Sequence, residues 1–151
     1  MNVVIVYDSQ YGNTQELAHT IAHSLSHYET VRVLPVRRAG EIDWDRLQLL
    51  VVGGPTHEHG LTESIRDWLA SLPPQRLAGI HAVAFDTRYH LPRFLSGSAA
   101  TEIAKELKKL GAEMPLPPES FYVTDEAGPL ADGELERAER WALLTPVGVE
   151  A

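Results

Sequence analysis

The sequence contains no cysteine, and this absence removes several kinds of chemistry at once. Disulfide bonds, thiolate catalysis and cysteine-ligated metal clusters are all excluded. The first ten residues, MNVVIVYDSQ, lack the basic region and the cleavage site of a signal peptide. No apolar run is as long as a membrane span. We therefore expect a soluble protein of the cytoplasm.

Basic residues are also scarce. Lys and Arg total 13 against 21 Asp and Glu, which gives a formal net charge of −8. Binding nucleic acid requires a basic face, and the chain offers little beyond the pair Arg37–Arg38, so we expect no nucleic-acid partner. An acidic surface favours encounter with partner proteins that carry basic docking surfaces. Solubility alone would explain the same charge equally well.

Two common nucleotide-binding motifs are missing. The pattern GxxxxGK[ST], whose lysine reaches the phosphates of a nucleoside triphosphate, does not occur. The pattern GxGxxG, which places a dinucleotide pyrophosphate on a helix, is absent as well. A phosphate bound by this chain would have to be held in another way.

What is present indicates one globular α/β domain spanning residues 1–151. Hydrophobic residues make up 44% of the chain and charged residues 23%, which is an ordinary globular balance. Five apolar runs predict strands, and apolar stripes of helical period lie between them. The predicted strands are Val3–Tyr7, Val31–Val36, Leu49–Gly54, Ala82–Phe85 and Phe121–Val123. The helical stripes are Leu17–Leu25, Ile65–Leu72, Ala100–Leu110 and Leu135–Ala142.

The alternation of strands and helices predicts a doubly wound parallel sheet with right-handed crossovers. Arg32 and Pro35 interrupt the second strand, and the fifth has polar flanks, so both suit sheet edges. The strand order is then 2-1-3-4-5, and the winding reverses between strands one and three. Ligands of such sheets bind at this reversal, beyond the carboxyl ends of the strands. The loops that must meet there are DSQYGNT, residues 8–14, and GGPTHEHG, residues 53–60.

The first of these loops has the features of an anion site. It leads from a buried strand directly into a helix, whose first N–H groups and dipole favour an anion. Hydroxyls of Ser9 and Thr14 and the small Gly12 would let a single terminal phosphate approach closely. The alternative is that the same residues only form a turn and a helix cap.

The stretch IVYDSQYGNTQELAHTIA resembles the phosphate loop of the flavodoxins, with LLVVGGPTHEHG and FDTR…SGSAATEIAKELKKLG similar to the family's second and third flavin loops. The resemblance covers nearly the whole chain and has no long insertion before the last helix, as in short-chain members. It implies one bound FMN and electron transfer between redox partner proteins. By motif match, the phosphate would be held by Ser9, Gln10, Tyr11, Gly12, Asn13 and Thr14. The ring would lie between Pro55, Thr56, His57, Glu58, His59 and Gly60 on one side and Thr87, Arg88 and Tyr89 on the other.

The third loop departs from the family's acidic pattern. Tyr89 could stack on the ring, but Arg88 and Arg93 add positive charge, and His57 and His59 stand where many flavodoxins have a stacking tryptophan. Positive charge near the reduced, anionic flavin predicts a less negative potential for the second electron. Arg88→Ala should then lower that potential by tens of millivolts, on the order of what one charge contributes at an effective dielectric near 20.

Three histidines, His19, His23 and His27, stand four residues apart on the first predicted helix. They lie opposite its apolar stripe, so we expect a solvated face there and no metal site. The pair His57 and His59 has no third ligand nearby in the sequence, and we expect no metal there either.

The residues leave more than one functional class open. A one-electron carrier needs only FMN and a docking surface, and we expect no separate catalytic residues in that case. A small NAD(P)H-dependent FMN quinone reductase is the alternative, because SQYGNT also resembles the phosphate loop of such enzymes. A third possibility is a protein that has the same fold but no longer binds flavin. Yellow colour in the purified protein, and its bleaching by NADPH alone, would separate these classes.

Overall fold

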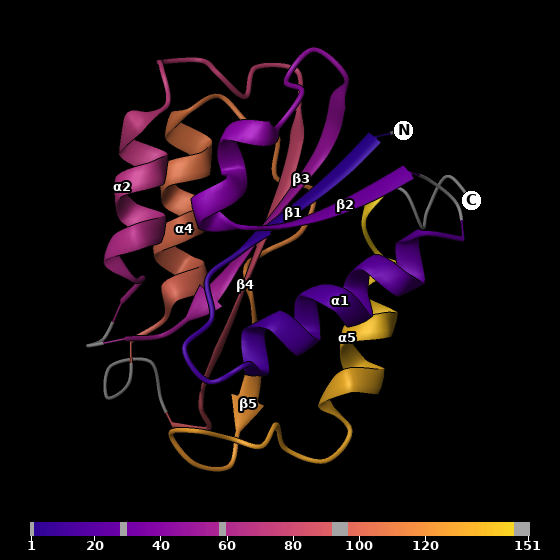
Figure 1. Ribbon diagram of the computed structural model, residues 1–151, viewed down its shortest axis with the longest axis vertical. Coiled ribbons are helices and arrows are strands. Elements are labelled where there is room, and N and C mark those ends of the chain that lie inside the picture. The colour runs from indigo at the N-terminus through magenta and orange to yellow at the C-terminus, as the bar shows by residue number, and fades with distance from the viewer. Residues whose placement is uncertain (1, 28–29, 58–59, 92–96, 147–151) are drawn as a thin grey trace.

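The computed structural model describes residues 2–27, 30–57, 60–91 and 97–146 and contains one five-stranded sheet (Figure 1). Its order is β2-β1-β3-β4-β5, and every neighbouring pair is parallel. The strands are β1 Asn2–Tyr7, β2 Thr30–Pro35, β3 Leu47–Pro55, β4 His81–Tyr89 and β5 Glu119–Val123. The predicted α/β fold, strand order and two edge strands are thus confirmed.

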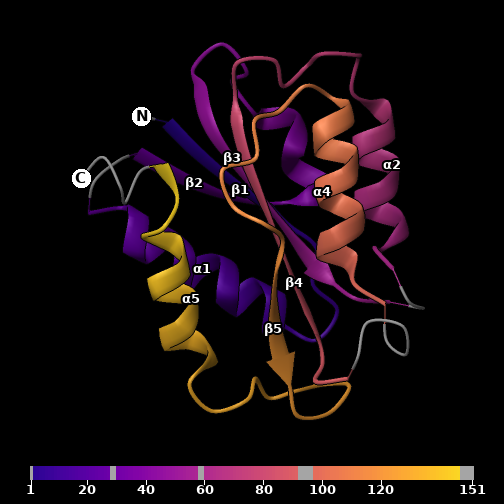
Figure 2. The same ribbon diagram turned by 180° about the vertical axis from the view of Figure 1, so that it is seen from behind.

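Helices cover both faces of the sheet, with α1 and α5 on one face and α2 and α4 on the other (Figures 1 and 2). The bounds are α1 Asn13–Leu25, α2 Glu63–Ser71, α4 Ala99–Lys109 and α5 Glu134–Ala142, with a 3-10 helix η1 at Val36–Glu41 that the sequence pattern did not predict. In the described part of the chain, no helix has the length and apolar character needed to cross a membrane.

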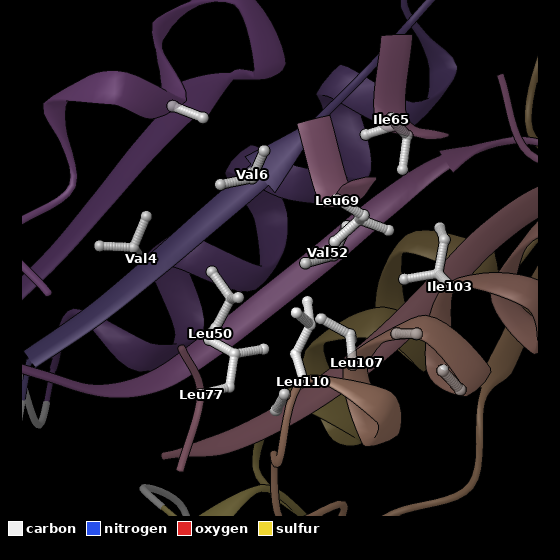
Figure 3. Packing of buried hydrophobic residues seen from close by; sticks show 14 of the residues in the cluster. Val4, Val6, Leu50, Val52, Ile65, Leu69, Leu77, Ile103, Leu107 and Leu110 are labelled. Atoms are coloured by element: carbon white, nitrogen blue, oxygen red, sulfur yellow. The ribbon is translucent and has the colours of Figure 1, made fainter. Parts of the chain in front are cut away.

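Alternate residues of each central strand enter two separate hydrophobic clusters. In β3, Leu50 and Val52 pack beneath α2 and α4 (Figure 3), whereas Leu49 and Val51 pack beneath α1 and α5. Both faces of this strand are therefore buried, which is why its sequence is continuously apolar instead of alternating. Trp141 is buried in the cluster beneath α1 and α5, whereas Trp68 is only partly buried against the other cluster.

His19 and His23 of α1 and His27 in the turn after it are all exposed, in agreement with the predicted solvated face. The rings of His23 and His27 meet edge to face with centroids 5.3 Å apart. Among the residues whose placement is described, no group of three or more potential metal ligands comes together.

A network of charged groups joins β5 to the start of α5. The Glu134 carboxylate accepts hydrogen bonds from the Tyr122 N–H at 2.8 Å and from the Arg137 guanidinium at 2.7 and 2.9 Å. Arg137 lies over the Phe121 ring, 4.5 Å from its centroid, and pairs with Glu119 at 3.3 Å. Burial alone would raise the pKa of Glu134, but the bonds from Arg137 and the Tyr122 N–H more than offset it and hold that pKa below its ordinary value.

This network makes part of the stability dependent on pH. We expect Glu134→Gln to lower the free energy of unfolding at pH 7 by about 1–3 kcal/mol, the usual effect of removing one partner of a charged hydrogen bond. Because the pKa is lower in the folded state, the stabilisation is complete above the unfolded value and is lost as pH falls through the folded one. Urea unfolding measured between pH 7 and pH 2 should show that the free energies of unfolding of the wild type and Glu134→Gln become equal in acid. Glu136→Gln on the exposed face of the same helical turn is the control. A difference that stays constant with pH would contradict this explanation.

Candidate functional site

A cavity of about 430 Å³ lies beyond the carboxyl ends of β1, β3 and β4, where the winding of the sheet reverses. Its lining comes from the three loops selected from the sequence and from the loop after β5. The lining residues are Ser9, Gln10, Tyr11, Asn13, Thr14, Pro55, Thr56, His57, Thr87, Arg88, Tyr89, Leu91, Val123 and Glu126. This is the position at which doubly wound sheets bind their ligands.

The first loop wraps around the start of α1. Gly12 occupies the N-cap position with φ of 94°, a left-handed conformation that favours glycine. The Ser9 Oγ accepts hydrogen bonds from the Gly12 N–H at 3.0 Å and the Gln15 N–H at 3.4 Å. Thr14 is buried, with its hydroxyl 3.2 Å from that of Thr87. Hydroxyls and N–H groups are thus gathered at the positive end of the helix dipole, as an anion requires.

Two side chains of this loop contact the loop after β5. The Asn13 amide donates to the Ala127 carbonyl at 3.1 Å, and the Tyr11 hydroxyl donates to Glu126 at 3.3 Å. A Cβ atom on Gly128 would lie 2.5 Å from the Asn13 side chain, so the two loops fit closely. The charge of Glu126 raises the pKa of the Tyr11 hydroxyl, because it opposes a second negative charge beside it.

The second loop is fixed to β4 and closes on itself. The Thr56 N–H donates to the Thr87 carbonyl at 2.8 Å, which continues the pairing of β3 with β4. His57 and Gly60 exchange backbone hydrogen bonds at 2.7 and 2.9 Å. Gly60 is buried beside Glu102 and does not line the cavity. Glu58 and His59, expected to flank a ring here, lie outside the described residues.

The third loop begins inside the sheet. Strand β4 continues to Tyr89 instead of ending at Phe85, so Thr87 and Arg88 belong to the strand. Tyr89 is exposed at the cavity. The Arg88 guanidinium donates to the carbonyls of Leu91 and Gly97 at 3.0 and 2.8 Å. Arg93, the other expected source of positive charge, lies outside the described residues.

The sequence pattern missed three residues of the lining, namely Leu91, Val123 and Glu126. Leu91 follows Tyr89 closely and would have been included had the third loop been taken two residues further. Val123 ends β5, and the rule that ligands bind beyond strand ends would have found it. Glu126 has no such signal, because it is 115 residues from Tyr11, its partner in the first loop.

The composition of the lining fits a flat ring that carries a phosphate. One end of the cavity combines the start of α1 with the hydroxyls of Ser9, Thr14 and Thr87. Apolar and aromatic surface comes from Pro55, Tyr89, Leu91 and Val123. Among the described residues that line this cavity there is no lysine, so an anion would be held at the start of α1 by neutral donors and the helix dipole.

Comparisons with known proteins agree with this geometry. The family model described as Flavodoxin matches residues 5–141. Oxidised Flavodoxin 2 from Bacillus cereus is similar in structure with a TM-score of 0.78 and 19% identity, and the match covers 100% of both chains. A flavodoxin from Streptococcus pneumonia TIGR4 matches with a TM-score of 0.77 and 20% identity, again over 100% of both chains. The rubredoxin oxygen:oxidoreductase of Desulfovibrio gigas matches with a TM-score of 0.71 and 21% identity, over 99% of this chain and 36% of that one. No curated protein sequence matches.

Proposed function

The chain belongs to the flavodoxin family of FMN-binding electron carriers, and we propose that the 430 Å³ cavity is where it holds FMN. The observation that carries this proposal is the buried pair of hydroxyls, Thr14 and Thr87, at the N-terminal end of α1 and inside the cavity. A helix terminus with converging hydroxyls, and with no lysine among the described lining residues, suits one phosphate group held by many hydrogen bonds.

The remaining lining residues take their roles from this placement. The backbone and hydroxyls of the first loop hold the phosphate, and the ring lies between the second loop, at Pro55 and His57, and the third, at Tyr89 and Leu91. Gly60 lies outside the lining and leaves room for the Glu102 carboxylate, whose oxygens would be 2.8 Å from a Cβ atom at this position. When bound, FMN supplies the one-electron chemistry, while the protein orients it and sets its surroundings.

Titration of flavin fluorescence tests this function. The fluorescence of added FMN should be quenched as it binds, with a stoichiometry of one FMN per chain. Riboflavin should bind more weakly because it lacks the phosphate. Anaerobic reduction of the complex should proceed with a chemical or protein donor. Failure to quench FMN would contradict the proposal. Bleaching of the bound FMN by NADPH alone would instead indicate a reductase.

Flavodoxins exchange electrons with redox partner proteins, and we propose that the partner docks over the cavity mouth. Three apolar side chains are exposed there, on Tyr11, Tyr89 and Leu91. Desolvation raises the pKa of the Tyr89 hydroxyl, and the nearby acidic residues Asp125 and Glu126 raise it further. An apolar centre with an acidic side fits a partner that presents basic residues around its own redox centre.

A charge reversal at Asp125 would test this surface. We expect Asp125→Lys to slow electron transfer to a basic c-type cytochrome, used as a model acceptor, by about 3- to 10-fold at low salt. The effect should shrink at high ionic strength, where the charges are screened. Asp45→Lys makes the same change in net charge on an exposed residue near the start of β3, at the opposite end of the sheet, and is the control. Equal slowing by both variants would indicate that net charge alone matters.

We also propose that the protein acts in the cytoplasm and that residues 1–151 fold as one domain. Fractionation of cells with an antibody to the chain, and a single cooperative unfolding transition, are the respective tests.

A further inference from the structure

Two charged residues of β4 are buried beside the cavity and point to the same face of the sheet. Asp86 has no exposed surface and Arg88 has 7% exposed. They stand two residues apart, so their side chains leave the strand in the same direction. A buried charge is tolerated only when strong hydrogen bonds replace water, and the partners of these two residues show what the charges hold.

Asp86 joins the second loop to the start of α4. Its Oδ2 accepts hydrogen bonds from the Ser98 hydroxyl at 2.7 Å, the Ala100 N–H at 2.9 Å and the Thr56 hydroxyl at 3.3 Å. The Thr56 oxygen in turn accepts from the Ala99 N–H at 3.1 Å. Thr56 lines the cavity. One carboxylate oxygen therefore fixes the second loop against the helix that follows the third loop.

Arg88 brackets the third loop. Its two terminal nitrogens donate to the carbonyls of Leu91 and Gly97, at either end of the segment between β4 and α4. The planar fork of arginine can hold two carbonyls at once, which the point charge of lysine does less well. Tyr122 supports the arrangement, because the Arg88 guanidinium lies 5.8 Å from its ring and His90 stacks on it at 4.3 Å.

We propose that Asp86 and Arg88 form a clamp that sets the separation of the second and third loops, and so positions both walls around the isoalloxazine ring. This rests on the proposed function of the cavity. The clamp acts through Thr56 and Leu91, which line the cavity. In the phosphate loop, by contrast, the Ser9 hydroxyl accepts from the N–H groups of Gly12 and Gln15 within its own loop and helix. The clamp is therefore a pair of positioning residues for the ring end of the ligand.

The clamp predicts a specific pattern of binding. Loss of either residue should weaken FMN and riboflavin by the same factor, because the two ligands share the ring and differ only at the phosphate. Arg88→Lys keeps the charge and loses the fork, so it also separates positioning from the purely electrostatic effect of Arg88. Asp86→Asn removes the charge but keeps an oxygen that can accept from the three donors. Its new NH₂ group can take the position of Oδ1, which has no hydrogen-bond partner among the described residues.

The experiment measures dissociation constants of FMN and riboflavin, and the reduction potential at saturating FMN, for four proteins. These are the wild type, Asp86→Asn, Arg88→Lys and Ile21→Val, a control in the core beneath α1 that lowers stability without touching either loop. We expect Arg88→Lys to raise both dissociation constants by about tenfold and Asp86→Asn by about 3- to 10-fold. Arg88→Lys and Asp86→Asn should also shift the reduction potential. Ile21→Val should change neither the dissociation constants nor the potential.

The possible results separate the inference from the proposed function. Weakening confined to FMN, or unchanged affinities in a folded Arg88→Lys, would overturn the clamp while leaving the cavity as the FMN site. A similar loss in Ile21→Val would overturn it too, since general destabilisation would then explain the effect. Wild-type protein that binds neither flavin would overturn the proposed function and the clamp together. Arg88→Lys decides the question if Asp86→Asn does not fold.

Discussion

Gly53→Ala should lower the free energy of unfolding by about 3–5 kcal/mol, more than the ~1–3 kcal/mol that overpacking of a core typically costs. A Cβ atom at Gly53 would lie 2.1–2.5 Å from three atoms of the Phe85 ring. No unstrained contact exists at that separation, so either the ring or the backbone of β3 has to move. The change is large against the 5–15 kcal/mol by which most domains are stable.

The Phe85 ring cannot easily move away from a new Cβ atom, because other rings pack against it. It is the cross-strand partner of Gly53, and its ring meets those of Phe121 and Trp141 edge to face, with centroids 6.1 Å away in both cases. Those two rings also contact each other at 5.9 Å. Close-packed aromatic rings of this kind transmit a displacement instead of absorbing it, so the strain should reach β5 and α5.

The neighbouring glycine offers a matched control. A Cβ atom at Gly54 would make only an ordinary contact with Ile65, at 3.7 Å, so Gly54→Ala should change stability much less. Phe85→Leu shortens the obstructing side chain, and Gly53→Ala should be less harmful in that background. Urea unfolding of the single and double variants gives the coupling energy. Additive effects of the two substitutions would show that the Phe85 ring is not the cause.

The strand order was predictable because it depends on short-range patterns. Proline and charge in β2 mark an edge, and uninterrupted apolar runs mark the centre. The phosphate loop was predictable for a similar reason, since residues 9–14 are contiguous and their order carries the chemistry. These features need no knowledge of which distant residues meet.

The end of β4 was not predictable in the same way. Asp86 and Arg88 look like the polar residues of a loop, whereas the structure keeps them in the strand because each finds hydrogen-bond partners between residues 91 and 100. The need for glycine at position 53 depends on its pairing with Phe85. Glu126 joins the cavity through the packing of the last loop on the first. The last two depend on contacts between residues far apart in the sequence, and the first depends on how the chain folds back from β4 to α4.

Thr14→Ala should raise the dissociation constant of FMN roughly ten- to a hundredfold and leave that of riboflavin nearly unchanged. Removing one charge-assisted hydrogen bond to the phosphate accounts for about 1.5–3 kcal/mol, which corresponds to that range. Thr14 is only 1% exposed, and its hydroxyl oxygen lies 3.2 Å from that of Thr87. Its loss therefore also leaves Thr87 without that partner, which favours the upper part of the range.

Thr14→Ser keeps the hydroxyl and removes only a methyl group, so it should retain most of the FMN affinity. Fluorescence titration of both ligands against both variants and the wild type gives the comparison directly. The expected pattern is opposite to that of the clamp variants, because the proposed function puts Thr14 at the phosphate end of the cavity and Asp86 and Arg88 at the ring end. If Thr14→Ala weakened FMN and riboflavin equally, the Thr14–Thr87 pair would be holding the shape of the cavity, and the phosphate would have to be bound by the N–H groups at the start of α1 without this hydroxyl.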